Sequence, residues 1–286
     1  MDSKELEIMA PAGNFECLAA AIEGGADSVY FGVGNLNMRS GSAKNFAPED
    51  LDEVVSICHR NSVKAYMTLN ITLYQSDLES MRKTLDAAKA AGVDAIIASD
   101  MACIAYCRKI GLEVHISTQL SISNAESLRF YSQFADVVVL AREVSLAQVK
   151  EIHRTIEEEN ICGPSGRQVR LEMFAHGAFC MAVSGKCYLS LMTYGKSSNR
   201  GECMQVCRHG YMVTDIKSGN QTGKPRTRST ISHAASFLLG FTLSLTIFVI
   251  GVSEMICEVT YSTVPIPSTA SRSLMPSSMR SSIISL

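Results

Sequence analysis

The sequence predicts an α/β fold, a TIM-like (β/α) barrel that is incomplete, with a Cys-rich segment after its seventh strand. Short apolar runs alternate with longer amphipathic stretches from residue 5 to about residue 174, which is typical of repeated βα units. No obvious antiparallel hairpin interrupts this alternation. A doubly wound open sheet is the alternative. It is weakened because the first strand is followed by Ala10-Pro11-Ala12-Gly13-Asn14 instead of the glycine-rich dinucleotide-binding motif.

Seven strands and six helices are expected to alternate along this part of the chain. The strands are expected at residues 5–10, 28–31, 64–69, 95–98, 113–117, 136–140 and 170–174. The helices are expected at residues 14–24, 48–61, 77–91, 101–110, 124–134 and 145–159. Pro48 suits a first helical turn, and Asp77 and Ser145 are suitable N-caps. Gly92 and Gly111 follow helices at positions where a left-handed residue is favoured.

The composition favours a cytoplasmic protein that binds a metal. The 286 residues carry a formal net charge of −2 and a pI of about 6.3, so no overall basic field indicates nucleic-acid binding, although a local basic rim remains compatible. Ten cysteines would suit a secreted disulfide protein only in a short chain behind a signal peptide. The chain begins MDSKELEIMAPAG, without an apolar signal segment, so we expect clustered cysteines to bind a metal.

Three regions are expected along the chain. Residues 1–175 are predicted to form the barrel, residues 176–220 a Cys-rich iron–sulfur or metal segment, and residues 221–286 a divergent Ser-rich tail. Within the tail, the uncharged run 234–252 has about the length that spans a bilayer. We nevertheless expect no membrane insertion, because the run is rich in Ser, Thr and β-branched residues and follows a region without any other membrane signal.

Polar side chains gather where the predicted strands end, which is where a parallel barrel carries its catalytic groups. Each could simply cap a helix or form a surface pair, but their convergence on one face favours a site. Arg39 and Arg142 are the natural anchors for an anionic substrate, because a guanidinium binds a carboxylate through two parallel hydrogen bonds. The residues in question are Asn14, Arg39, Asn70, Ser99, Asp100, Ser117, Thr118, Gln119, Arg142, Glu143 and His176.

The strongest local signal is a cysteine quartet within residues 174–208. Cys180, Cys187, Cys203 and Cys207 lie in a Gly-rich stretch, and such thiolates bind a soft ion or an iron–sulfur cluster. The spacing differs from a zinc ribbon, so zinc or another divalent metal is the less favoured alternative. Four buried structural thiols are the other alternative. His176 precedes Cys180 by four residues and could act as an acid, a substrate ligand or a donor to the metal site.

Several motifs resemble one known family. They are APAGNFE, GADSVYFG, HISTQLSISN, LAREVSL, FAHGAFCMAVSGKCYLS and SNRGECMQVCR. Over residues 5 to about 215 the chain resembles the collagenase-like peptidase family U32. The resemblance implies a TIM-like barrel. It also implies one of two activities, either that of a collagenase-like, metal-dependent peptidase (a hydrolase acting on collagen-like peptides) or RNA modification.

The better understood branches of this family are iron–sulfur proteins that hydroxylate pyrimidines of tRNA or rRNA, with prephenate as a co-substrate, or that hydroxylate a ubiquinone precursor. The resemblance implies that Cys180, Cys187 and Cys203 hold a 4Fe–4S cluster, with Cys207 as the less secure fourth ligand. On this hypothesis His176, Arg142 and Glu143 are the catalytic candidates. The candidates for binding the co-substrate are Arg39, Asn70 and Gln119.

The resemblance is expected to stop near Gly219, and the tail after Lys224 departs from the family pattern. A frame-shifted or otherwise aberrant C-terminus would explain the abrupt change in composition. The barrel would then lack its closing strand and leave an open sheet edge, which invites aggregation. A truncated, inactive product is therefore the third functional hypothesis, beside the RNA-hydroxylating protein and the peptidase.

Overall fold

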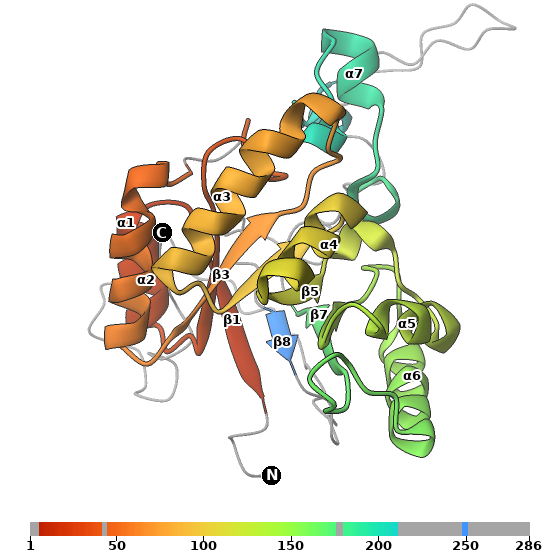
Figure 1. Ribbon diagram of the computed structural model, residues 1–286. Helices are drawn as coiled ribbons and strands as arrows, with labels where there is room; N and C mark the ends of the chain where they lie inside the picture. Colours follow the sequence, from red (N-terminus) through yellow and green to blue (C-terminus); the bar gives the residue numbers. More distant parts are fainter. Residues whose placement is uncertain (1–5, 42–44, 176–179, 211–247, 251–286) are drawn as a thin grey trace, which may run out of the picture.

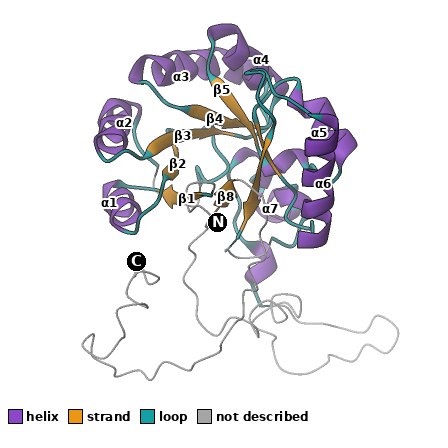
Figure 2. Ribbon diagram, turned by 90° about the horizontal axis from the view of Figure 1, so that it is seen from below, coloured by secondary structure: helices purple, strands orange, loops and turns teal. Residues whose placement is uncertain are grey.

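The computed structural model describes residues 6–41, 45–175, 180–210 and 248–250 as a closed barrel surrounded by helices. Seven strands are parallel and neighbour one another in sequence order. Seen from below, the strands form a ring, and the helices α1 to α6 lie around it in an arc that leaves the side of β1 and β8 uncovered (Figure 2). The seven predicted strands are confirmed as β1 (Glu7–Ala12), β2 (Ser28–Gly32), β3 (Lys64–Leu69), β4 (Ala95–Ala98), β5 (Glu113–Ile116), β6 (Val137–Val139) and β7 (Arg170–Phe174).

The eighth strand differs from the prediction of an incomplete barrel. Strand β8 (Phe248–Ile250) pairs antiparallel with both β1 and β7, so that Ile250 lies opposite Glu7 on one side and Glu172 on the other. Within the described residues this short strand pairs with the edge that the sequence analysis expected to be open, so part of the run 234–252 belongs to the fold. The physical reason is that the edges of β1 and β7 carry free backbone N–H and C=O groups, which three apolar residues can satisfy.

The six predicted helices are present outside the sheet, together with a short helix in the Cys-rich segment. The Asn14 side chain accepts a hydrogen bond from Cys17 N at 2.7 Å, and Ser145 forms a capping box with Gln148. Gly92 and Gly111 are left-handed, with φ of 82° and 73°. The helices are α1 (Phe15–Glu23), α2 (Leu51–Arg60), α3 (Leu78–Ala91), α4 (Met101–Ile110), α5 (Ala125–Ser132), α6 (Leu146–Glu159) and α7 (Leu189–Tyr194).

Two predicted helix starts are replaced by short 3-10 turns. Pro48 opens the turn Pro48–Asp50, which precedes α2 instead of forming its first turn. Asp77 ends the turn Gln75–Asp77, and its carboxylate accepts a hydrogen bond from Tyr74 N at 2.7 Å instead of capping α3. The Asp77 carboxylate also pairs with Arg200 of the Cys-rich segment, which explains why it turns away from the helix.

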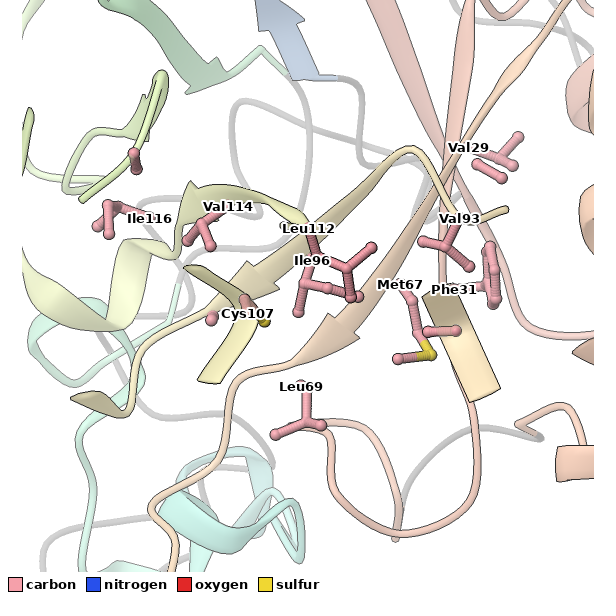
Figure 3. Packing of buried hydrophobic residues seen from close by; sticks show 14 of the residues in the cluster. Val29, Phe31, Met67, Leu69, Val93, Ile96, Cys107, Leu112, Val114 and Ile116 are labelled. Atoms are coloured by element: carbon pink, nitrogen blue, oxygen red, sulfur yellow. The ribbon is translucent and has the colours of Figure 1, made fainter. Parts of the chain in front are cut away.

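The core has two layers, because successive side chains of a strand point to opposite faces of the sheet. The outer layer fills the space between the strands and the helices, and Figure 3 shows part of it, including Val29, Phe31, Met67 and Ile96. The inner layer fills the barrel itself. It comprises Met9, Tyr30, Tyr66, Ala95, Ile97 and Val139, with Phe174 packed against it.

No helix in the described part of the chain has the length and apolar character needed to cross a bilayer. Of the run 234–252, which the sequence analysis weighed as a membrane candidate, the structure describes only β8. The rest of that run, and the rest of the predicted tail 221–286, lies outside the described residues.

Candidate functional site at the mouth of the barrel

A pocket of about 250 Å³ opens at the carboxyl ends of the parallel strands. Its walls come from the strand ends and from the Cys-rich segment, which Figure 1 places at the end of the barrel away from the start of β1. Of the three catalytic, three co-substrate-binding and four cysteine candidates, the structure thus brings eight together in this pocket. These are Arg39, Asn70, Gln119, Arg142, Cys180, Cys187, Cys203 and Cys207.

The four predicted cysteine ligands are free thiols that line the same pocket. Burial raises the pKa of Cys207, the positive charge of Arg208 opposes that shift, and the nearby thiols of Cys180, Cys203 and Cys187 raise it further. The sulfurs of Cys180, Cys187 and Cys203 are therefore close enough to Cys207 to influence its thiol electrostatically. The Cys187 Sγ also accepts a hydrogen bond from Leu189 N at 3.4 Å.

The chemistry of this set of sulfur donors fits a soft metal or an iron–sulfur cluster. Within the described residues, however, no three His, Cys, Asp or Glu side chains are arranged so that they could hold an ion as they stand. To enclose an ion, the thiols would have to move closer together within the pocket that they share.

Arg200 fastens the Cys-rich segment to the barrel. Its guanidinium donates a hydrogen bond to the Asp77 Oδ2 at 2.7 Å and lies 4.1 Å from the centre of the Tyr74 ring. The hydrogen bond from Arg200 is the main cause that lowers the pKa of Asp77. Beside it, Thr72 N donates to Asn199 O at 3.0 Å. The cysteines are therefore held over the strand ends by contacts that lie outside the pocket.

Gly201 allows the segment to approach the loop after β2 very closely. Gly41 N donates to Gly201 O at 3.0 Å. A Cβ at Gly201 would come within 2.2 Å of Ser40 Oγ and 2.3 Å of Asn37 O, and the φ of 85° also disfavours any other residue. Gly201 follows Arg200, which is paired with Asp77, and precedes Cys203 by two residues. Its close backbone contact therefore fixes the start of the Cys203–Cys207 loop.

Two arginines supply positive charge at the mouth of the pocket. The Arg39 Cζ lies 5.8 Å from the centre of the Tyr30 ring, and the Arg142 Cζ lies 4.5 Å from that of Phe174. Neither guanidinium forms an ion pair with a carboxylate of the described residues, whereas Arg129, Arg170 and Arg200 all do. Stacking on a ring orients each guanidinium and leaves its N–H groups available for an anion.

Asn70 organises the wall between the two arginines. Its Oδ1 accepts a hydrogen bond from Met38 N at 3.1 Å, next to Arg39. Its Nδ2 donates to Ser117 Oγ at 3.3 Å and lies 3.5 Å from Gln119 Oε1, which also bonds the Ser117 hydroxyl. Asn70 and Gln119 thus lie in one network that joins the ends of β3 and β5.

Two predicted catalytic residues are placed differently from the rest. Glu143 does not line the pocket; its carboxylate accepts hydrogen bonds from Ser184 N at 3.1 Å and from Ser184 Oγ at 3.5 Å. It therefore anchors the turn Val183–Gly185 between Cys180 and Cys187, and its catalytic role stays a prediction. His176 lies outside the described residues.

Glu172 is an acidic pocket residue that the sequence analysis missed. It lies on β7, is fully buried and lines the pocket floor. Burial raises its pKa to about 8, and the negative charge of Glu7 contributes to the same shift. A signal was available, because alternation along Arg170–Phe174 predicts that Arg170, Glu172 and Phe174 point into the barrel, where a carboxyl group is unusual.

A sequence model described as Peptidase family U32 matches residues 13–245 of this chain. The chain belongs to peptidase family U32. The match confirms the resemblance proposed from the motifs. It also extends beyond Gly219, where the sequence analysis expected the resemblance to stop.

Relatives of this U32 chain carry two kinds of name. A collagenase of Porphyromonas gingivalis is 59% identical over 219 residues, which are 77% of this chain and 53% of that protein. The tRNA hydroxylation protein P1 of Bacillus subtilis is 37% identical over 76% of this chain and 50% of its own length. A 23S rRNA 5-hydroxycytidine synthase of Escherichia coli is 34% identical over 75% of this chain and 31% of its own length.

The U32 chain thus spans about half the length of the first two relatives and about a third of the rRNA synthase. Among solved structures, a U32 peptidase matches 51% of this chain and 63% of its own, with a TM-score of 0.44 and 14% identity. The family includes proteins labelled as peptidases and RNA-hydroxylating enzymes.

Proposed function

We propose that this chain is an iron–sulfur protein of the RNA-hydroxylating type, which uses a small carboxylic acid as co-substrate. The observation that carries the proposal is that four free thiols and two arginines without a described ion-pair partner line one pocket. Cys180, Cys187, Cys203 and Cys207 would hold a 4Fe–4S cluster, which supplies one-electron chemistry when it is bound. Zinc or another divalent metal is the alternative occupant.

Arg39 and Arg142 would bind the carboxylate groups of the co-substrate, for which prephenate, a dicarboxylate, is the candidate. Their guanidinium groups are oriented by Tyr30 and Phe174, so little conformational freedom would be lost when the anion binds. Asn70 and Gln119 would complete the wall beside the anion through the network that joins β3 to β5. The RNA would supply the pyrimidine, consistent with the relatives named for tRNA hydroxylation and rRNA 5-hydroxycytidine synthesis.

The second candidate is a collagenase-like peptidase. The specific observation in its favour is the 59% identity to a protein named collagenase. What weighs against it is the chemistry of the mouth pocket, whose described residues offer soft sulfur donors and anion-binding groups and include no nucleophile hydrogen-bonded to a base.

Anaerobic purification separates the two proposals. An iron–sulfur protein contains iron and acid-labile sulfide and has a broad visible absorbance, whereas a zinc protein has none. We expect iron and sulfide in the purified chain and no cleavage of gelatin by the same preparation. Gelatin cleavage that persists after all iron has been removed would contradict the hydroxylation proposal and support the peptidase.

A further inference from the structure

Glu172 separates the mouth pocket from the interior of the barrel. It is opposite Val139 of β6 in the sheet register and alternates with Arg170 and Phe174 along β7. The residue is fully buried but still contributes to the pocket lining. Among the described residues, neither of its carboxyl oxygens has a hydrogen-bond partner. A group with such unused bonding capacity at the floor of a pocket can bind a ligand.

The neighbours below Glu172 do not neutralise it. The His115 Nδ1 on β5 lies 3.8 Å from Glu172 Oε2, too far for a hydrogen bond, and the imidazole is also fully buried. Burial lowers the pKa of His115, so the ring is uncharged at neutral pH. Glu7 on β1 adds negative charge, and Arg170 on the same strand adds the opposing positive charge.

The remaining charges in the interior are paired with one another at the opposite end of the barrel. Lys64 Nζ lies 2.7 Å from Glu7 Oε2, and Arg170 Nη2 lies 3.0 Å from Glu113 Oε1. Tyr66, whose ring centre is 4.6 Å from that of His115, donates its hydroxyl hydrogen to Glu7 at 2.6 Å. These pairs leave Glu172 as the carboxyl group of the described interior whose oxygens have no hydrogen-bond partner, in a residue that lines the mouth pocket.

An ionised carboxylate buried without partners costs several kcal/mol, whereas the protonated acid avoids most of that cost. The raised pKa of about 8 expresses this preference, so Glu172 carries a proton at neutral pH. A protonated carboxyl group can donate a hydrogen bond, which a carboxylate cannot do. It also does not repel an anion that is held by the arginines at the rim.

We propose that Glu172 is a ligand-binding residue of the mouth pocket, which donates the hydrogen of its neutral carboxyl group to a carbonyl or hydroxyl oxygen of a bound carboxylic acid. The ligand class is therefore a small oxo- or hydroxy-carboxylic acid. Its carboxylate lies at Arg39 or Arg142, and its second oxygen reaches the floor. The inference rests on the anion site of the proposed function.

The test is calorimetric titration of the purified chain with 2-oxoglutarate, an oxo-dicarboxylate that does not itself titrate near neutral pH. Loss of the Glu172 proton should weaken binding by about tenfold between about pH 7 and about pH 9, and binding at the higher pH should take up a proton. Glu172→Gln keeps a neutral donor. We expect Glu172→Gln to bind 2-oxoglutarate at the lower pH with an affinity similar to that of the unmodified chain. The decrease in affinity that loss of the Glu172 proton causes at the higher pH should be absent from this variant.

The thiols of the pocket are unchanged in the Glu172→Gln variant. The difference between the two proteins therefore isolates Glu172. Glu158→Gln, at an exposed carboxylate on α6, is the matched control and should behave as the unmodified chain. Should Glu172→Gln not fold, Glu172→Asp should bind more weakly at both pH values, because it withdraws the acid from the floor, and should keep the pH dependence.

A Glu172→Gln variant with the same pH dependence and proton uptake as the unmodified chain would overturn the inference. So would an unmodified chain whose affinity is independent of pH. Arg39→Lys and Arg142→Lys test the underlying anion site, since unchanged affinity in both variants would refute that site while leaving the pH comparison at Glu172 intact. Absence of any binding by the unmodified chain would overturn both.

Discussion

The His115 imidazole and the Glu172 carboxyl group lie 3.8 Å apart inside the barrel, and neither is exposed to solvent. Burial raises the pKa of Glu172 to about 8 and lowers that of His115. Both groups are therefore uncharged at neutral pH, and they separate the ion pairs at the bottom of the barrel from the pocket at its mouth. This pair should leave a distinct pH dependence of stability.

Glu172 should make the folded state less stable as the pH rises between about 4.5 and about 8. The folded chain keeps the Glu172 proton in this range because its pKa is raised, whereas the unfolded chain has already lost it. The slope should be about 1.4 kcal/mol of unfolding free energy per pH unit, and it should vanish above the folded pKa. Urea denaturation of the unmodified chain and of Glu172→Gln across this range measures it.

His115 acts in the opposite direction at acid pH, since its pKa is lowered and the unfolded chain binds the proton first. The comparison is therefore best made above about pH 6.5, where the unfolded imidazole has lost its proton. If the unfolding free energies of the unmodified chain and of Glu172→Gln changed in parallel above that pH, Glu172 would be ionised in the folded chain.

Cys180→Ser and Cys187→Ser should each abolish or strongly reduce iron binding, because an oxygen ligand suits soft iron poorly. Cys162→Ser is the control, as this thiol lies near the other end of the barrel, donates a hydrogen bond to Asn160 O and is no part of the mouth pocket. Iron and sulfide analysis after anaerobic purification measures the effect. Equal iron in all three variants would refute the ligand assignment.

Arg142→Lys should weaken binding of a dicarboxylate by about 1–3 kcal/mol, because lysine keeps the charge but loses the planar fork. It should also lose part of the stacking on Phe174. Calorimetry at constant pH and ionic strength measures the change. Arg154→Lys, at an exposed position of α6, should bind like the unmodified chain, and an equal loss in both variants would contradict a specific role of the Arg142 guanidinium.

The sequence predicts most of this fold because most of its signals are local. Alternation identifies the seven parallel strands, and caps such as Asn14 and Gly111 identify helix ends. β8 has no such signal, since three residues pair there only because two distant strands leave their edges free. In the same way, Arg200 reaches Asp77 across 123 positions of the chain. The position of the cysteines over the mouth therefore follows from long-range contacts.

Gly201→Ala should loosen the Cys-rich segment while leaving the barrel folded. The added methyl group would collide with the backbone oxygen of Asn37 and with Ser40, and alanine disfavours the φ of 85°. We expect lower iron retention and faster proteolysis within residues 180–210, with little change in the far-ultraviolet circular dichroism. Gly195→Ala is the control. It has a similar φ of 66° but open space around it, so it tests strain without collision.

Closure of the barrel by β8 reverses one expectation from the sequence. If the tail were foreign to the fold, removal of residues 225–286 would improve solubility. Because β8 pairs with both β1 and β7, its removal should instead expose two sheet edges and promote aggregation. Val249→Pro tests the same pairing without truncation, since proline cannot donate its backbone hydrogen bond within a strand that has neighbours on both sides.

We expect Val249→Pro to lower the free energy of unfolding by about 1–3 kcal/mol, the cost of leaving a backbone group of the sheet without its partner. Val249→Thr keeps the backbone N–H and a β-branched side chain, so it should lose less. Chemical denaturation of both variants, with light scattering of the truncated chain, provides the measurements. Unchanged stability in Val249→Pro together with better solubility on truncation would mean that the barrel is open between β7 and β1 in solution.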